Sequence, residues 1–204
     1  MNLLIVDNFD SFTYMLVDYL RQAGANCRVV RNNQSFGCFT EEPVDAVVLS
    51  PGPGTPQQAG HLMNVIDYYH QKVPMLGVCL GHQAIGEFFG ATLSVAKRPM
   101  HGKVSTMQLI ADDVLWDNVP EKFAVTRYHS LLLTDLPDAL VSLAETDQKE
   151  VMALRHITLP IRGVQFHPEA ALTENGLQII KNWINSTVFI GNKADSSLLT
   201  AQYA

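Results

Sequence analysis

The sequence is poor in the features that mark several common protein classes. It has three cysteines among 204 residues and no Cys-x-x-Cys pair, so neither a disulfide framework nor a zinc site is indicated. Acidic residues outnumber basic ones by 20 to 14, the net charge is −6, and no basic run occurs. This balance argues against a protein that binds nucleic acid by neutralising phosphates.

Long apolar runs are also missing. No stretch approaches the roughly 20 apolar residues that span a bilayer, and the first residues lack the basic region of a signal peptide. We therefore expect a cytoplasmic protein with reduced thiols and no membrane contact. The length fits one large domain with a sizeable core.

Apolar runs alternate with helical patterns in the first half. Residues 2–6 are typical of a buried parallel strand, and residues 12–23 place apolar side chains on one helical face. Asp10 or Ser11 is the expected N-cap of that helix, and Gly24 its end. Further strands are expected at residues 27–30, 46–50 and 74–78, with helices near residues 63–69 and 82–90. The alternation predicts an α/β fold with an open, mostly parallel, twisted sheet flanked by helices, as in flavodoxin-like proteins.

The second half is richer in strand patterns. We expect an antiparallel β portion added to the parallel core, at residues 103–110, 123–129, 139–146 and 150–156. One more strand is predicted at residues 161–166, followed by a helix at residues 173–185. The predicted organisation is a domain over residues 1–186 and a loosely ordered tail over residues 187–204.

The stretch "MLGVCLGHQ" contains the first chemical signal. A strand, the run Gly-Val-Cys-Leu-Gly around Cys79, and a helix form the context in which a sharp turn presents a nucleophile. The helix N-terminus favours a thiolate, and the backbone N–H after Cys79 can stabilise an oxyanion. We expect the turn to expose the sulfur at the rim of the sheet. A buried structural cysteine is the alternative.

A thiol nucleophile needs a base, and the base needs an orienting group. The motif "VQFHPE" offers His167 and Glu169 at the end of the 161–166 strand. The loop "SPGPGTP", residues 50–56, is either a rigid turn or the source of a second oxyanion donor. His82, one turn into the helix after Cys79, is expected to support local packing.

In this order, "SPGPGTP", "GVCLGHQ", "RYHSL" and "GVQFHPE" resemble the motifs of class I (triad-type) glutamine amidotransferases. The segments "DNFDSFTYMLVDYL" and "MHGK" are most similar to the glutaminase component II of anthranilate synthase and of aminodeoxychorismate synthase. The resemblance implies a glutaminase with that family's fold and no cofactor. Cys79 would form a thioester with glutamine, His167 would serve as base and then acid, and Glu169 would orient His167.

The resemblance also implies the substrate site and the partner. The residues that would hold L-glutamine or its oxyanion are Gly52, Pro53, Gly54, Leu80, Gln83, Ser130 and Leu131. Ammonia would pass to a chorismate-binding synthase subunit, component I. One departure from the family pattern is Ala170-Ala171 after "HPE", where many relatives have Ser-Ile.

Two other interpretations remain open. A cysteine hydrolase of another small amide or ester would use the same nucleophile, although α/β-hydrolases place the acid before the histidine in the chain. A non-catalytic flavodoxin-like module would explain the first half but leave the coincidence of Cys79, His167 and Glu169 without a cause.

Overall fold

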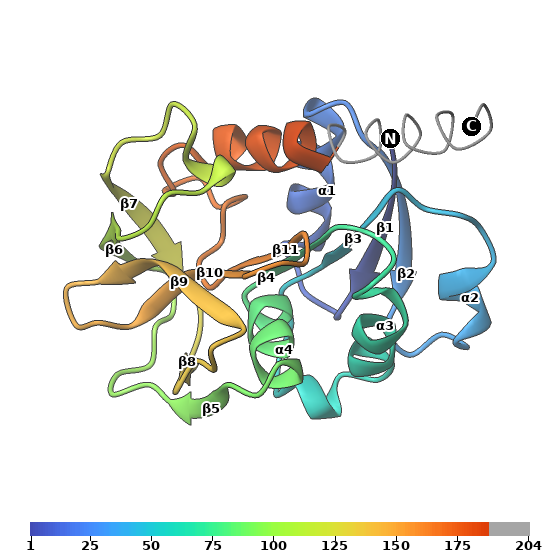
Figure 1. Cartoon of the computed structure of the whole chain (residues 1–204), viewed down its shortest axis with the longest axis horizontal. Helices are drawn as coiled ribbons and strands as arrows, with labels where there is room; N and C mark the ends of the chain where they lie inside the picture. Colours follow the sequence, from blue (N-terminus) through green and yellow to red (C-terminus); the bar gives the residue numbers. More distant parts are fainter. Residues whose placement is uncertain (188–204) are drawn as a thin grey trace, which may run out of the picture.

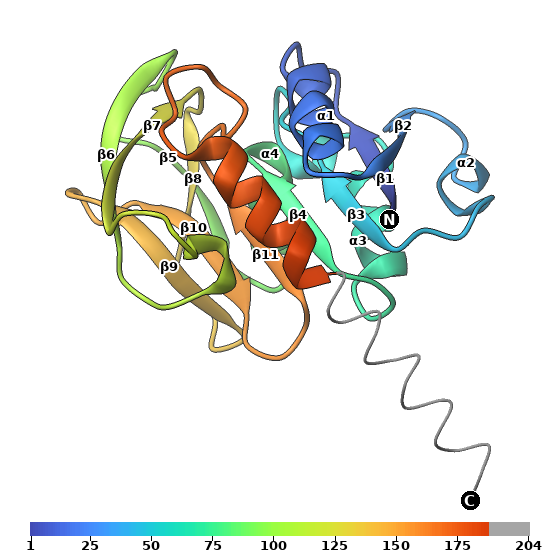
Figure 2. The ribbon, with the colours of Figure 1, turned by 90° about the horizontal axis from the view of Figure 1, so that it is seen from above.

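The computed structural model describes residues 1–187. Figures 1 and 2 show the arrangement of its elements. The elements in chain order are β1 (Asn2–Asp7), α1 (Thr13–Gln22), β2 (Asn26–Arg31), α2 (Gly37–Thr40), β3 (Ala46–Leu49), the 3₁₀ turn η1 (Pro56–Gln58), α3 (Leu62–Tyr69), β4 (Met75–Val78), α4 (Leu80–Phe88), β5 (Thr92–Val95), β6 (Lys103–Leu109), the 3₁₀ turn η2 (Val114–Trp116), β7 (Lys122–Arg127), β8 (Leu131–Thr134), β9 (Leu140–Thr146), β10 (Val151–His156) and β11 (Ile161–Val164). A further helix covers residues 176–187.

Within residues 1–187 the main sheet has nine strands in the order β2-β1-β3-β4-β11-β10-β9-β6-β7. The strands from β2 to β11 pair in parallel, and those from β11 to β7 pair antiparallel. This confirms the predicted α/β fold with an antiparallel addition. A separate pair, β5 and β8, was not predicted, because each run is only four residues long.

Alternation along the parallel strands divides the core into two layers. Leu3 and Ile5 of β1 point to the face covered by α1 and the 176–187 helix, whereas Leu4 and Val6 point to the face covered by α3 and α4. Figure 1 shows the first helical layer above the sheet and the second below it. Because both faces are covered, β1 is apolar at successive positions, as expected for a buried parallel strand.

Two details of the helical predictions need correction. Helix α1 begins after Phe12, which has no side-chain cap, so neither Asp10 nor Ser11 is the N-cap. Asp10 instead accepts a hydrogen bond from the Phe12 N–H at 2.8 Å, in the turn that precedes the helix. The last helix begins at residue 176 rather than 173 and continues to 187, while residues 188–204 lie outside the described part of the chain. The loosely ordered tail therefore stays a prediction.

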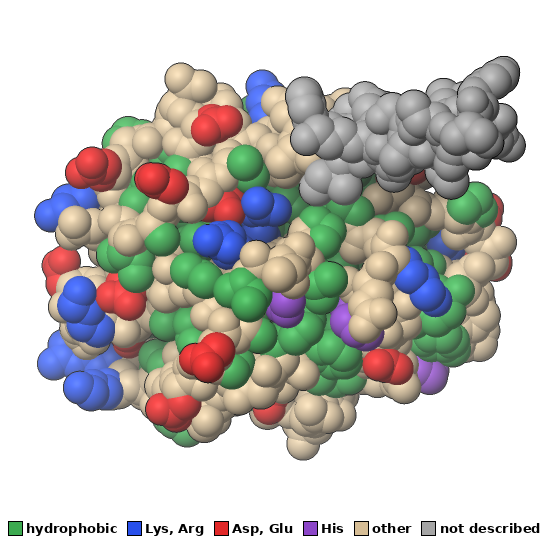
Figure 3. All heavy atoms as spheres, in the orientation of Figure 1, with side chains coloured by type: hydrophobic (Ala, Val, Ile, Leu, Met, Phe, Trp, Pro, Cys, Tyr) green, Lys and Arg blue, Asp and Glu red, His purple; other side chains and the backbone are tan. Residues whose placement is uncertain are grey.

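The surface view agrees with the charge pattern. On the face drawn in Figure 3, Lys and Arg side chains are interspersed with Asp and Glu, and no continuous basic surface forms on that face. No helix in residues 1–187 is both long and apolar enough to cross a membrane.

Candidate active site

Cys79 lies in the turn between β4 and α4, in a backbone conformation that is rare for a side-chain-bearing residue, with φ 52° and ψ −100°. The two flanking glycines make this turn feasible. A Cβ at Gly77 would collide with the backbone of Gly81 and His82, and one at Gly81 would collide with Leu49 of β3. The first turn of α4 is therefore pressed directly against the ends of β3 and β4. A strained backbone conformation persists only where the surrounding packing holds it in place, and such conformations are concentrated at functional sites.

The sulfur is less accessible than the sequence predicted. Cys79 is at the rim of the sheet, but it is 6% exposed, so the expectation of an exposed thiol was wrong. The Cys79 N–H donates to the Val164 carbonyl at 2.8 Å, which extends the β4–β11 pairing to the nucleophile itself. The residues that follow β11 consequently lie beside the thiol and shield it.

His167 and Glu169 form a buried pair at this rim. Their Nδ1 and Oε1 atoms are 2.6 Å apart, and both residues are almost wholly inaccessible. Nε2 of His167, the nitrogen turned away from Glu169, has no hydrogen-bond partner of ordinary geometry within residues 1–187. Burial alone lowers the pKa of His167, but interactions with Cys79 and Glu169 outweigh burial and raise this pKa well above its usual range. The arrangement therefore favours a protonated imidazole beside the thiol.

Two aromatic rings hold the imidazole in place. The centroids of Phe12 and Tyr128 lie 5.3 and 5.1 Å from that of His167, both in edge-to-face geometry. The two rings also contact each other at 5.0 Å. Sequence reasoning missed this support, because Phe12 was predicted only as part of the apolar face of the helix over residues 12–23, and Tyr128 comes from a different part of the chain.

Gly52 brings the proline-rich loop against the nucleophile turn. A Cβ at Gly52 would lie 2.5 Å from Cβ of Asn8 and 2.7 Å from Cδ2 of Leu80, so only glycine allows this approach. Asn8 fixes the loop by donating from its backbone N–H to Ser50 Oγ and from its side chain to the Ser50 carbonyl, both at 2.9 Å. The Leu80 N–H belongs to the first turn of α4, where backbone donors have no intrahelical partner.

The predicted glutamine-binding residues come from three separate segments. Pro53 and Gly54 are exposed beside Gly52. Nε2 of Gln83 donates to the Leu131 carbonyl at 2.9 Å, which joins α4 to the "HSL" segment. The Ser130 side chain is exposed, and its carbonyl accepts a hydrogen bond from the Ala96 N–H at 2.8 Å. The structure thus brings these positions to the rim that carries Cys79.

A buried ion pair supports the "RYHSL" segment from behind. Arg127 is 2% exposed and its Nη2 lies 2.5 Å from Oε2 of Glu150, the residue before β10. The same guanidinium lies 3.1 Å from Nε2 of His129. Burial, followed by the Arg127 charge, lowers the pKa of His129 to about 3, so this imidazole is neutral at ordinary pH. The pair fixes the backbone immediately before Ser130.

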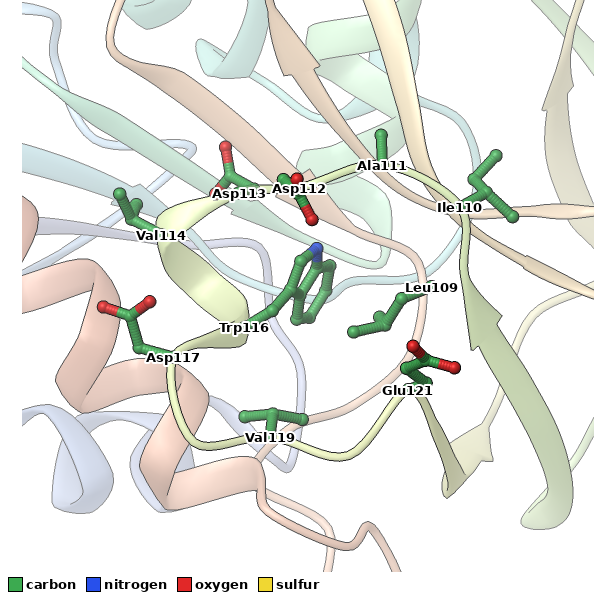
Figure 4. A pocket seen from close by; sticks show the side chains of 10 residues that line it. All are labelled: Leu109, Ile110, Ala111, Asp112, Asp113, Val114, Trp116, Asp117, Val119 and Glu121. Carbon is green, nitrogen blue, oxygen red and sulfur yellow. The ribbon is translucent and has the colours of Figure 1, made fainter.

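A large cavity of about 790 Å³ lies elsewhere. It is formed by the chain between the end of β6 and the start of β7, with Trp116 at its centre and four carboxylates around it (Figure 4). None of its lining residues is among the predicted site residues. The catalytic rim is therefore recognised by its chemistry and not by cavity size.

Comparison with known proteins agrees with this geometry. A family model for class-I glutamine amidotransferases matches residues 4–186. Anthranilate synthase component 2 of Azospirillum brasilense is 47% identical over 192 residues, covering 91% of this chain and 96% of that protein. The protein of the same name from Mycobacterium tuberculosis is 45% identical over 190 residues, covering 90% and 82%.

Solved structures give the same picture of the fold. A Thermoplasma acidophilum protein described as a candidate component of GMP synthase is 27% identical, with a TM-score of 0.86 and coverage of 96% of this chain and 98% of that one. A glutamine amidotransferase from Thermotoga maritima shares the fold at 19% identity, with a TM-score of 0.72 and coverage of 96% and 85%. Together with the extent of the family match, these similarities show that the chain belongs to the class-I glutamine amidotransferase family.

Proposed function

We propose that this chain is the glutaminase subunit of an anthranilate synthase. The observation that carries the proposal is the placement of a strained, glycine-flanked Cys79 beside the buried His167–Glu169 pair. Family membership supplies glutamine as the substrate class. The names of the relatives with 45–47% identity supply anthranilate synthase as the assembly.

The proposed reaction proceeds through a thioester. The thiol proton of Cys79 passes to Nε2 of His167, and Sγ attacks the side-chain amide carbon of glutamine. Backbone N–H groups at Gly52 and Leu80 stabilise the resulting oxyanion. The imidazolium returns the proton to the departing amide nitrogen, which leaves as ammonia. Water, deprotonated by His167, then cleaves the thioester to release glutamate and regenerate the thiol.

Glu169 keeps the imidazole in the tautomer and orientation that this sequence needs. Its carboxylate faces Nδ1, so Nε2 is the nitrogen that exchanges a proton with sulfur and with the leaving group. The raised pKa of His167 favours the imidazolium form, which donates the proton to the leaving group. Gln83 and Leu131, together with Ser130 and the Gly52–Gly54 loop, would position the substrate.

Ammonia released at the rim would pass to component I, which binds chorismate and uses the ammonia. A row of rings connects the catalytic imidazole with the surface. The exposed His101 lies 5.8 Å from Tyr128, and Tyr128 lies 5.1 Å from His167. A synthase subunit bound over the Met100–Lys103 segment would therefore contact the support of the catalytic base. We place this assembly in the cytoplasm.

The test is covalent labelling with an electrophilic glutamine analogue, mapped by peptide mass. We expect one adduct on Cys79 that excess glutamine prevents. In an assay with a chorismate-aminating partner, Cys79→Ser should abolish glutamine-dependent synthesis and leave ammonia-dependent synthesis intact. Cys38→Ser, in the short helix α2, is the matched control and should behave as wild type. Normal glutamine use by Cys79→Ser would refute the nucleophile assignment.

The product of the same assay decides the pathway. Formation of anthranilate supports the proposal as stated, whereas formation of 4-amino-4-deoxychorismate would assign the chain to aminodeoxychorismate synthase. Turnover of small esters without glutamine protection would favour a general cysteine hydrolase. A folded chain that neither reacts with the analogue nor supports a synthase would correspond to a non-catalytic module.

A further inference from the structure

Strand register places Gln165 directly beside the nucleophile. Strands β11 and β4 pair in parallel with Val164 opposite Val78, so the next residues, Gln165 and Cys79, are also neighbours. The Gln165 N–H donates to the Met152 carbonyl of β10 at 2.8 Å, which anchors the backbone. The side chains of Gln165 and of His167, two residues later, both lie against Cys79.

The side chain of Gln165 is fully buried and connects two functional groups. Its Nε2 lies 3.7 Å from Sγ of Cys79, and its Oε1 accepts a hydrogen bond from Nε2 of Gln83 at 3.1 Å. Gln83 also donates to the Leu131 carbonyl at 2.9 Å. A continuous chain of amide groups therefore runs from the "HSL" segment to the sulfur.

The direction of this chain is fixed by its far end. The Leu131 carbonyl can only accept, so Gln83 must present its NH₂ group there. The same NH₂ group supplies the donor to Gln165, which must then turn its oxygen toward Gln83 and its own NH₂ toward sulfur. Both N–H bonds of Gln83 are committed, and its carbonyl oxygen remains available to accept a hydrogen bond from a substrate N–H.

We propose that Gln165 is a catalytic residue whose amide N–H stabilises the thiolate form of Cys79, and that Gln83 and Leu131 hold this amide in its productive orientation. The inference rests on the proposed function, since it requires Cys79 to be the nucleophile. A hydrogen bond to a charged acceptor is stronger than one to a neutral acceptor, so Gln165 stabilises the thiolate relative to the thiol.

The test measures the rate at which iodoacetamide alkylates Cys79, with peptide mapping to separate Cys79 from Cys27 and Cys38. Gln165→Met keeps the length of the side chain but removes the amide. We expect alkylation of Cys79 to slow by roughly tenfold, from the loss of one hydrogen bond to a charged group, while alkylation of the other two cysteines is unchanged. Gln34→Met, at an exposed position, is the matched control and should alkylate like wild type.

Two further readouts separate chemistry from folding. The kcat for glutamine hydrolysis by Gln165→Met should fall by a similar factor, with a smaller change in KM. Gln83→Met should slow alkylation by less than Gln165→Met does, because it releases the Gln165 amide without removing it. If Gln165→Met does not fold, as judged by near-ultraviolet circular dichroism, Gln165→Leu replaces it in the same assays.

The outcomes distinguish this inference from the proposed function. If wild-type Cys79 reacts no faster than Cys38 and glutamine gives no protection, the nucleophile assignment fails and this inference falls with it. If wild-type Cys79 is selectively reactive and the folded Gln165 variants match its rate and its kcat, Gln165 has no role in the chemistry. Slower alkylation together with a lower kcat supports the assignment.

Discussion

His82 makes the stability of this protein depend on pH in a calculable way. The residue lies in the first turn of α4 and is 0% exposed, and neither ring nitrogen has a hydrogen-bond partner within residues 1–187. Its Nδ1 would lie 2.9 Å from a Cβ at Gly163, so the glycine of β11 makes room for the ring. Burial disfavours the charged form and lowers the pKa of His82 from 6.5 to about 4, and a weak contact with the backbone of Gly163 offsets only part of this shift.

The sign of the effect follows from the direction of the shift. A depressed pKa means that the unfolded chain takes up a proton first, so stability is lost as pH falls below 6.5 toward the folded-state pKa. Between about pH 7.5 and about pH 4.5, His82 alone should remove about 2.5 kcal/mol from the free energy of unfolding. His167, whose pKa is raised, gains stabilisation as pH falls from about 7.5 toward 6.5 and so opposes this trend in the upper part of the interval, but the same contribution is present with or without His82.

The measurement is urea unfolding at a series of pH values, followed by the fluorescence of the buried Trp116 and Trp183. His82→Leu removes the titrating group, and its stability should vary less with pH than that of wild type by about 2.5 kcal/mol over this interval. After burial and the Arg127 charge, the His82 charge is a further cause of the low pKa of His129, but this pKa of about 3 lies below the interval, so the contribution of His129 nearly cancels in the difference. Parallel pH dependences for the two proteins would show that His82 is protonated in the folded state without cost, and would refute the reasoning.

Three further substitutions test other parts of the site. Gly52→Ala keeps the backbone N–H, but its Cβ would collide with Asn8 and Leu80 and move this donor away from the oxyanion, so kcat for glutamine should fall by roughly 10²-fold or more while ammonia-dependent synthesis is retained. Gly37→Ala, where a Cβ meets open space, is its control. Gly176→Ala places a Cβ against the Pro168 carbonyl of the "HPE" loop, so we expect the loop to shift and kcat to fall by a larger factor than KM rises. Unchanged kinetics would show that the loop can move without altering the position of His167. Glu150→Gln leaves Arg127 buried without its countercharge and should cost about 3 kcal/mol in urea unfolding, whereas a loss under about 0.5 kcal/mol would contradict the buried ion pair.

The parallel core and the identity of the catalytic rim were predictable because they depend on local patterns. Apolar runs located β1, β3, β4 and β11, and parallel strand ends meet at one edge, so residues following β4 and β11 had to converge. The pair β5–β8 and the role of Gln165 were missed because they depend on which strands become neighbours. The signal for Gln165 was present in the sequence, since it lies two residues before His167 at the end of the predicted 161–166 strand.

The exposure of the nucleophile was wrong for a related reason. A glycine-flanked turn fixes where the Cys79 backbone lies, but the side chains that cover the sulfur come from β11 and from the loop after it. The motif "GVCLGHQ" contains no information about these covering side chains. The same holds for the rings of Phe12 and Tyr128 that hold His167, since neither the apolar face at Phe12 nor the motif "RYHSL" around Tyr128 indicates a contact with His167.

What distinguishes Cys79 from the other two thiols is therefore the packing around it and not the thiol itself. Cys27 lies on β2, where burial raises the pKa of its thiol and favours the unreactive form. The sulfur of Cys38, in the four-residue helix α2, lies 3.3 Å from the hydroxyl of Ser35. At Cys79, glycines at positions 52, 77, 81 and 163 allow four backbone segments to close around the first turn of α4. A side chain at any of the four would displace the turn, the loop beside it or His82 behind it, so the geometry of the nucleophile depends on residues that have no side chain at all.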